Sequence, residues 1–235
     1  MICYAFPLAH EAGEVLKQCT QKEQFSIGDL RCTLGNFGGR PILVALIGMG
    51  QTRAAENTQA IFQYFRPKGF ILAGYGGALV PQMKVGQVVM SVNFSSPEVQ
   101  QFLRLLSGFD FATFCTADEL ADTPKKRDWY ASNKQRQVID MESAAVADVV
   151  FARAVPFMAV RVISDEYSQV LPSGALEAGF DPATDQPTPL RLLTYLALHR
   201  GEIAPFKKFV AGLSVARKNL THFLVQLNDD LPASW

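Results

Sequence analysis

The chain contains a series of short apolar runs that alternate with helical patterns, and this feature constrains its fold more than any other. The runs are rich in β-forming residues and almost uninterrupted by polar ones, as is typical of strands buried on both faces of a parallel sheet. We expect strands at 2–6, 31–37, 41–48, 69–74, 87–92, 111–116, 137–141 and 157–164. We expect helices at 10–19, 52–66, 97–107, 142–154, 188–199 and 203–227. The alternation predicts an α/β fold with a mixed, mostly parallel central sheet and helices on both faces.

We expect one domain over residues 1–235, with a C-terminal helical extension from about residue 188, because no linker, repeat or low-complexity tract interrupts the chain. The stretch "GNFGGRP" predicts a hairpin that joins 31–37 to 41–48. The segment 165–190 is rich in Pro, Gly and Asp, which indicates a long loop.

The composition argues against several classes of protein. The chain has 22 Lys plus Arg and 22 Asp plus Glu, so no net charge favours nucleic acid as a partner. Its four cysteines are scattered with no His at ligand spacing, so we expect neither disulfides nor a metal site, and we expect no cofactor. The N-terminal stretch lacks a signal-peptide pattern, and no run approaches the roughly 18 apolar residues of a membrane span. We therefore expect a cytoplasmic protein.

Polar residues follow several of the expected strands. Ligands of open parallel sheets bind beyond the carboxyl ends of the strands, so residues at these places are candidates for a site. Three acids stand there: Glu11, Glu142 and Asp165. The glycine-rich stretches "GMGQT" (48–52) and "GYGGAL" (74–79) follow two other strands. If 137–141 is an interior parallel strand, all five features converge on one edge of the sheet.

Each of these features also has a purely structural interpretation. The glycine stretches could be tight turns, since neither matches a dinucleotide fingerprint or a P-loop. Glu142 could favour a helix start through the helix dipole, and Asp165 could cap a loop. His10, His199 and His222 share no motif, and we interpret them as surface or core residues.

Four segments together resemble the nucleoside phosphorylase/nucleosidase superfamily. They are "GMGQTRAAENTQAIF", "GYGGALVPQMKVGQVVMS", "VIDMESAAVADVV" and "FMAVRVISDEYS", and the likeness covers roughly residues 1–168. Among its members, the chain is most similar to methylthioadenosine/adenosylhomocysteine nucleosidases. The stretch "ISDEYSQVLPSG" and the C-terminal tail look most like nucleosidases of hopanoid lipid synthesis, which the resemblance implies act on adenosylhopane.

The resemblance implies roles for individual residues. Glu142 would accept hydrogen bonds from ribose hydroxyls, with Met141 packed under the sugar, and Asp165 would bind the purine and protonate N7. Leu120 stands where the family usually offers a phenylalanine that stacks on the base, and Tyr75 stands where a small residue is common. The expected substrate-binding residues are Met141, Gly76, Gly77, Met49, Tyr75, Leu120 and Ser164. The resemblance also implies a small-molecule nucleoside as partner and a homo-oligomer, with a dimer favoured.

Water and phosphate remain alternative second substrates at this point. A phosphorylase needs cationic donors, and the family's phosphorylases carry arginines in two loops that read "PLAHEAGE" and "LAGYGG" here. Glu11 occupies the place at which nucleosidases activate water, which favours hydrolysis, although Arg40 and Arg53 remain candidate phosphate ligands. The stretch 93–109 is shorter than the family's usual lid, so an inactive nucleoside-binding relative is a third reading.

The tail "FKKFVAGLSVARKNLTHFLVQL" has two structural interpretations. Its apolar residues form one helical stripe, which indicates a terminal helix packed on the sheet. Its basic residues lie at the edges of that stripe, as in helices that bind membrane surfaces, and we expect membrane contact only if the substrate carries a lipid.

Overall fold

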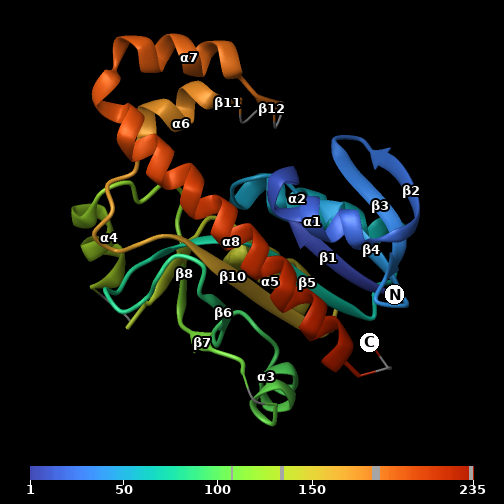
Figure 1. Ribbon diagram of the computed structural model, residues 1–235. Coiled ribbons are helices and arrows are strands. Elements are labelled where there is room, and N and C mark those ends of the chain that lie inside the picture. The colour runs from blue at the N-terminus through green and yellow to red at the C-terminus, as the bar shows by residue number, and fades with distance from the viewer. Residues whose placement is uncertain (107, 133–134, 182–185, 233–234) are drawn as a thin grey trace.

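A mixed sheet organises the chain (Figure 1). The computed structural model describes residues 1–106, 108–132, 135–181, 186–232 and 235, and in these residues the main sheet has ten strands. They are β1 (Ile2–Phe6), β2 (Thr20–Ile27), β3 (Leu30–Phe37), β4 (Arg40–Leu46), β5 (Gly69–Ala78), β6 (Val88–Ser91), β7 (Phe111–Ala112), β8 (Phe114–Thr116), β9 (Val138–Asp140) and β10 (Phe157–Asp165). A small pair, β11 (Phe180–Asp181) and β12 (Gln186–Pro187), lies apart from them.

The strand order is β2-β3-β4-β1-β5-β10-β6-β7. The centre, β4-β1-β5-β10, is parallel, whereas β2, β3 and β4 form an antiparallel meander and β6 runs antiparallel to β10. The mixed, mostly parallel sheet predicted from the sequence is therefore correct. The predicted hairpin is the β3–β4 turn, where Gly38 and Gly39 adopt φ of 55° and 78°.

Helices cover both faces of the sheet. They are α1 (Ala9–Gln18), α2 (Gln51–Tyr64), α3 (Pro97–Arg104), α4 (Pro124–Ala131), α5 (Ser143–Phe151), α6 (Ser173–Gly179), α7 (Pro189–Leu198), the 3₁₀ turn η1 (Arg200–Glu202) and α8 (Ile203–Asp230). Alternate residues of each central strand face opposite layers. In β1, Cys3 and Ala5 face the layer of α2 and α5, whereas Tyr4 and Phe6 face the layer of α1, α3 and α8.

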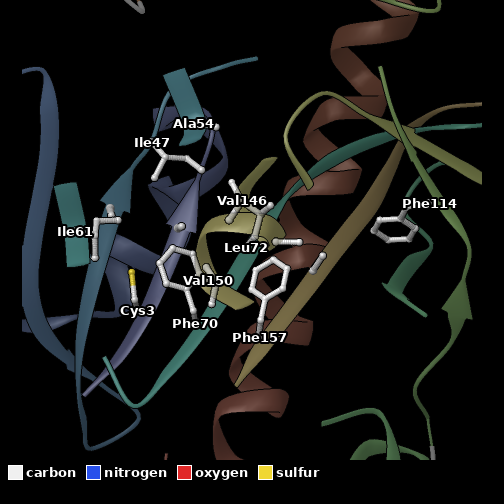
Figure 2. Packing of buried hydrophobic residues seen from close by; sticks show 14 of the residues in the cluster. Cys3, Ile47, Ala54, Ile61, Phe70, Leu72, Phe114, Val146, Val150 and Phe157 are labelled. Carbon is white, nitrogen blue, oxygen red and sulfur yellow. The ribbon is translucent and has the colours of Figure 1, made fainter. Parts of the chain in front are cut away.

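Phenylalanines fill the layer of α2 and α5 (Figure 2). Phe70 of β5 stacks against Phe62 of α2 with ring centroids 5.8 Å apart, and Phe157 of β10 lies 6.1 Å from Phe70. These rings bridge neighbouring strands and the helix above them, so the central strands are fixed on this side by close apolar packing.

Several expected boundaries were wrong. The run 137–141 is only the three-residue strand β9, which pairs antiparallel with β5 and parallel with β8. The run 111–116 is split at Thr113 into β7 and β8, and the helix expected at 97–107 ends at Arg104, residue 107 lying outside the described residues. The stretch 165–190, expected to be a loop, contains α6, β11 and β12, apart from 182–185, which are not described.

The helices expected at 188–199 and 203–227 are α7 and α8. The second half of α8 packs on the sheet through Leu220, Leu224 and Leu227, which are all fully buried. The first half runs past the sheet toward α6 and α7, which lie together at the top of Figure 1. Among the described residues, no helix is long and apolar enough to cross a membrane.

Candidate functional site

Three buried carboxyl groups mark the candidate site. Glu11 lies in the first turn of α1 just after β1, Glu142 is the N-cap residue of α5 just after β9, and Asp165 ends β10. Their exposed fractions are only 3%, 4% and 5%. Buried acids are rare because removing a charge from water is costly, and a cluster of them with shifted pKa values is typical of a functional site.

The glycine run of β5 lies against two of these acids, Glu11 and Asp165. A Cβ atom at Gly74 would lie 2.7 Å from Oε1 of Glu11, and one at Gly77 would lie 2.9 Å from Oδ2 of Asp165. Both distances are too short for a real side chain. The stretch "GYGGAL" is therefore not the tight turn that one interpretation offered: β5 continues through it, and its glycines allow the acids to approach the strand.

Glu11 is held by backbone donors. The N–H of Leu8 donates to Oε2 at 2.8 Å, and the N–H of Tyr75 donates to Oε1 at 2.7 Å. The pKa of Glu11 is nevertheless raised to about 8, mainly by burial and also by the negative charge of nearby Glu142, against the opposing effect of these hydrogen bonds and of Arg161. The group can therefore hold or release a proton near neutral pH.

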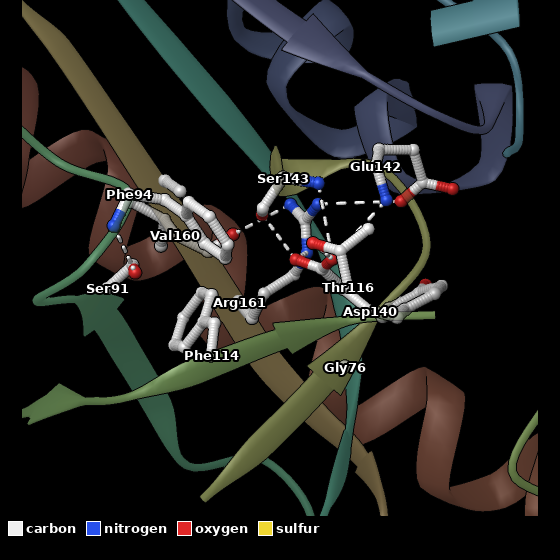
Figure 3. Close-up of polar contacts among 12 residues, drawn as sticks. Gly76, Ser91, Phe94, Phe114, Thr116, Asp140, Glu142, Ser143, Val160 and Arg161 are labelled. Atoms are coloured by element: carbon white, nitrogen blue, oxygen red, sulfur yellow. Dashed lines mark hydrogen bonds and ion pairs between the residues drawn. The ribbon is translucent and has the colours of Figure 1, made fainter. Parts of the chain in front are cut away.

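Glu142 connects the glycine stretch "GMGQT" to a buried arginine. The N–H of Gly50 donates to Oε1 at 3.0 Å, and the Arg161 guanidinium lies 3.4 Å from Oε2. Figure 3 shows that this guanidinium also faces Asp140, whose Oδ2 accepts from Nε at 3.1 Å. Burial raises the pKa of Glu142 to about 7, and the Arg161 charge limits this rise.

Asp140 completes the support beneath Glu142. Its carboxylate accepts hydrogen bonds from the hydroxyls of Thr116 and Ser143 and from the backbone N–H of Ser143. These contacts tie β8, β9 and the start of α5 together. Asp140 is thus a structural support.

Asp165 is paired with an arginine that the sequence analysis did not single out. The Arg127 guanidinium lies 2.5 Å from Oδ2, and the Ser164 hydroxyl donates to Oδ1 at 2.5 Å. Arg127 also donates to the carbonyls of Ala78, Ala121 and Glu166. Burial raises the pKa of Asp165, and Arg127 opposes this change most strongly.

Three of the other expected site residues, Met141, Met49 and Gly76, are chain neighbours or hydrogen-bond partners of residues in this cluster. Met141 and Met49 are half-buried chain neighbours of Glu142 and Gly50, which are hydrogen-bonded to each other. Gly76 is in β5, and its carbonyl accepts from the Ser164 hydroxyl at 3.3 Å.

Tyr75 and Leu120 complete the expected set. Tyr75 donates its backbone N–H to Glu11, and its hydroxyl lies 2.8 Å from Nδ1 of His10. Leu120 is 41% exposed on the loop before α4. That loop reaches the cluster through the neighbouring Ala121, whose carbonyl accepts from Arg127.

Three residues near the acids were missed or discounted. Arg161 had a signal, because it interrupts the apolar run "FMAVRVIS" at a position that alternation places in the core. Arg127 had none, since it lies in the polar stretch "PKKRD" and looks like a surface residue. His10, interpreted as a surface or core residue, is exposed but contacts Tyr75.

Two surface hollows lie elsewhere. One, of about 320 Å³, is lined by residues that include Gln87, Asp110 and Gln137. The other, of about 430 Å³, is lined by residues that include Thr113 and Arg136. Neither hollow is lined by any of the three buried acids.

The chain is similar to known enzymes over most of its length. The model of the phosphorylase superfamily matches residues 2–112 and 108–178. The 5'-methylthioadenosine/S-adenosylhomocysteine nucleosidase of Actinobacillus succinogenes is 25% identical over 194 residues, which cover 67% of this chain and 82% of that protein. The corresponding protein of Lysinibacillus sphaericus is 22% identical over 175 residues, covering 61% and 76%.

Solved structures have the same fold. A mutant futalosine hydrolase of Helicobacter pylori superposes with a TM-score of 0.75 at 15% identity, covering 98% of this chain and 99% of that one. The S-adenosylhomocysteine nucleosidase of Streptococcus pyogenes, in complex with 5-methylthiotubericidin, gives 0.71 at 16% identity, covering 99% and 97%. Since the family model spans well over half of the residues, the chain belongs to the phosphorylase superfamily, as its motifs predicted.

Proposed function

We propose that this protein is a purine nucleosidase that hydrolyses the N-glycosidic bond of a 5'-modified adenosine and releases adenine. The observation that carries the proposal is a cluster of three buried carboxyl groups, in which Glu11 and Asp165 lie against the glycine run of β5 and Glu142 interacts electrostatically with Glu11. The similarity to nucleosidases supports the same reaction class.

Cleavage of the ribose–N9 bond proceeds through a sugar with oxocarbenium character, as in glycoside hydrolysis. The purine is a poor leaving group as an anion, so it must gain a proton as the bond breaks. We assign this proton to Asp165, which would deliver it to N7 while the bonding electrons move to the base. Its raised pKa favours the protonated form that a general acid requires.

Glu142 is assigned to the sugar. An ionised carboxylate accepts hydrogen bonds from two neighbouring hydroxyls and stabilises positive charge that develops on the ring. Arg161 and the N–H of Gly50 orient this carboxylate. Met141 and Met49, half-buried beside it, supply apolar contact for the ribose.

Glu11 is assigned to water. As a base it would take one proton from a water molecule whose oxygen bonds to C1' of the sugar. The proton given up by Asp165 and the one gained by Glu11 balance after exchange with solvent. A pKa of about 8 for Glu11 then predicts that turnover rises as the pH increases toward this value, because the base must be ionised.

Phosphorolysis is less well supported. Arg40, one candidate phosphate ligand, donates to the carbonyls of Leu231 and Pro232 at the end of α8, so its guanidinium is engaged away from the acids. Arg53, the other candidate, lies with its side chain against Gly48.

The 5'-substituent, the cellular location and the assembly are finer proposals. Resemblance of the "ISDEYSQVLPSG" segment and of the tail to hopanoid-linked nucleosidases supports adenosylhopane as substrate. With Leu120 in place of an aromatic ring, we propose apolar contact rather than stacking on the base. We also propose a cytoplasmic homodimer, as the resemblance implies.

The test is a product analysis. The purified protein is incubated with adenosine, 5'-methylthioadenosine, S-adenosylhomocysteine and inosine, with and without phosphate, and products are identified by mass spectrometry. We expect a free base and an unphosphorylated sugar at a rate independent of phosphate. Asp165→Asn should lower the rate by about 10²–10⁴, the usual contribution of a general acid. Ribose 1-phosphate as the main sugar product would instead identify a phosphorylase. If neither these nucleosides nor adenosylhopane, tested in the same way, is cleaved, the result would favour a nucleoside-binding protein without activity.

A further inference from the structure

Helix α7 exposes leucines. Leu190, Leu193 and Leu198 are 80%, 65% and 77% exposed, and α7 has no buried residue. Leu190 and Leu193 are three residues apart and therefore share one side of the helix, with Leu198 at its edge. Scattered exposed leucines are ordinary, but three on ten residues of one helix form an apolar face.

The opposite side of α7 is held in place. Leu192 packs against Gly179 of α6, and the Tyr195 hydroxyl donates to Glu202 at 2.7 Å. Glu202 in turn accepts from the backbone N–H of Ala175 at 3.0 Å. The leucine face is thus carried by an arm that consists of α6, α7, η1 and α8 up to Lys218, and its leucines are exposed. Figure 1 shows α6 and α7 together at its top, beside the start of α8.

From the start of α7 onward the arm is strongly basic, in a chain that has no net charge, whereas α6 carries the exposed acid Glu177. Residues 188–218 contain one acid, Glu202, whose carboxylate is already hydrogen-bonded within the arm. The same stretch contains six basic residues: Arg191, Arg200, Lys207, Lys208, Arg217 and Lys218. The arm therefore combines exposed apolar side chains with excess positive charge.

The arm begins at the edge of the candidate site. A Cβ atom at Gly212 of α8 would lie 3.3 Å from the carbonyl oxygen of Ser164, the residue before Asp165. Five residues later, Arg217 lies 3.5 Å from Glu14 of α1, the helix that carries Glu11. A partner surface bound by the arm would therefore lie next to the candidate site.

We propose that the arm docks the protein on an anionic lipid bilayer, with the leucines of α7 inserted into the interface and the basic residues against lipid phosphates. Helices with exposed leucines and a lysine- and arginine-rich flank bind such surfaces through both contributions. A second copy fits less well, because a two-fold contact between identical arms would bring like charges together. The proposal does not depend on the proposed function.

The test is vesicle sedimentation of the full-length protein. Wild-type protein should sediment with phosphatidylcholine vesicles containing 30% phosphatidylglycerol at low salt, and much less with pure phosphatidylcholine or at 0.5 M NaCl. Leu190→Ser with Leu193→Ser should weaken the binding at least about tenfold, because the inserted apolar area is lost. Lys207→Gln with Lys208→Gln should weaken it up to about 25-fold, at about fivefold per charge.

Matched controls remove the same groups elsewhere. Leu105→Ser changes a leucine that is 85% exposed directly after α3, and Lys68→Gln with Lys125→Gln removes two exposed lysines. Both controls should bind vesicles as the wild type does. Absence of wild-type sedimentation, equal loss in the controls, or binding that ignores lipid charge and salt would each overturn the proposal. So would light scattering that shows a dimer which only the leucine variant dissociates, since that result assigns the face to a second copy.

Discussion

Replacing Arg127 by Met tests the pairing between the buried arginine and Asp165. The change removes a fully buried guanidinium and leaves an uncompensated carboxylate that is 5% exposed. Breaking a buried ion pair in this way costs about 3–5 kcal/mol. Loss of a neighbouring positive charge also raises the pKa of an acid by about 1–3 units, so Asp165 should hold its proton to higher pH in the variant.

The sign of the pH dependence follows from this shift. An acid whose pKa is raised in the folded state stabilises the protein below its unfolded pKa and loses that contribution as the pH rises through the folded value. The Arg127→Met variant should therefore be destabilised most at pH 8 and least at pH 5. Urea unfolding at both pH values measures the difference, and Lys125→Met on the same helix is the control.

A double-mutant cycle separates the loss of the ion pair from the other effects of removing Arg127. Combining Arg127→Met with Asp165→Asn leaves a neutral pair, so the double variant should recover at least about 2 kcal/mol of the stability lost at pH 8. If the losses of unfolding free energy from the two substitutions are additive, and the loss from Arg127→Met is the same at pH 5 and pH 8, then Arg127 does not control the pKa of Asp165 and the reasoning is refuted. In the activity assay, the alkaline limb should move to higher pH by the same shift.

Three further predictions follow from the site. Because burial raises the pKa of Glu11 to about 8, the free energy of unfolding should fall between about pH 5 and 9 by up to about 4–5 kcal/mol, as protonated Glu11 becomes ionised. Glu11→Gln should flatten this pH dependence in urea unfolding, and a flat wild-type profile would contradict the prediction. A Cβ at Gly77 meets Asp165, so Gly77→Ala should lower kcat/KM at least about tenfold, whereas Gly13→Ala, in open space on α1, should leave it unchanged; equal effects would refute the crowding. Glu142→Gln should lower kcat/KM by about 10–150-fold, the equivalent of 1.5–3 kcal/mol, for a ribonucleoside but hardly for its 2',3'-dideoxy analogue; equal losses on both would exclude the ribose role.

The sequence predicted the centre of the fold well because the physics there is local. Continuous apolar runs identified β1, β4 and β10, and two glycines identified the β3–β4 turn. The strand ends then located Glu11 and Asp165 at one edge, because parallel strands share the direction in which they end.

What the sequence did not predict is decided by tertiary contacts. β2 was missed because its residues "TQKEQFSI" are mainly polar and mostly exposed, as suits an edge strand that must avoid pairing with other chains. α4 was missed because one of its two buried residues is Arg127, which looks like a surface residue until its acceptors on the distant residues Ala78 and Glu166 are known.

The extension of β5 shows a third kind of limit. The letters "GYGGA" are typical of a turn, and only the approach of Glu11 and Asp165 to the strand explains why glycine is needed within it. Local propensity cannot detect a residue that must be small because of groups many positions away.

The end of α8 has a consequence for how the molecule is made. Asn228 accepts from the Tyr4 hydroxyl at 3.1 Å and donates to the carbonyl of Phe37 at 3.2 Å, so the first strand is covered by the last helix. During synthesis α1 and α3 can cover only part of the face of β1 that carries Tyr4 and Phe6, and the part beneath α8 stays uncovered until more than 220 residues have been joined. The nascent chain therefore presents an apolar sheet surface to other chains for most of its translation, and ribosome-associated chaperones are the natural protection for it.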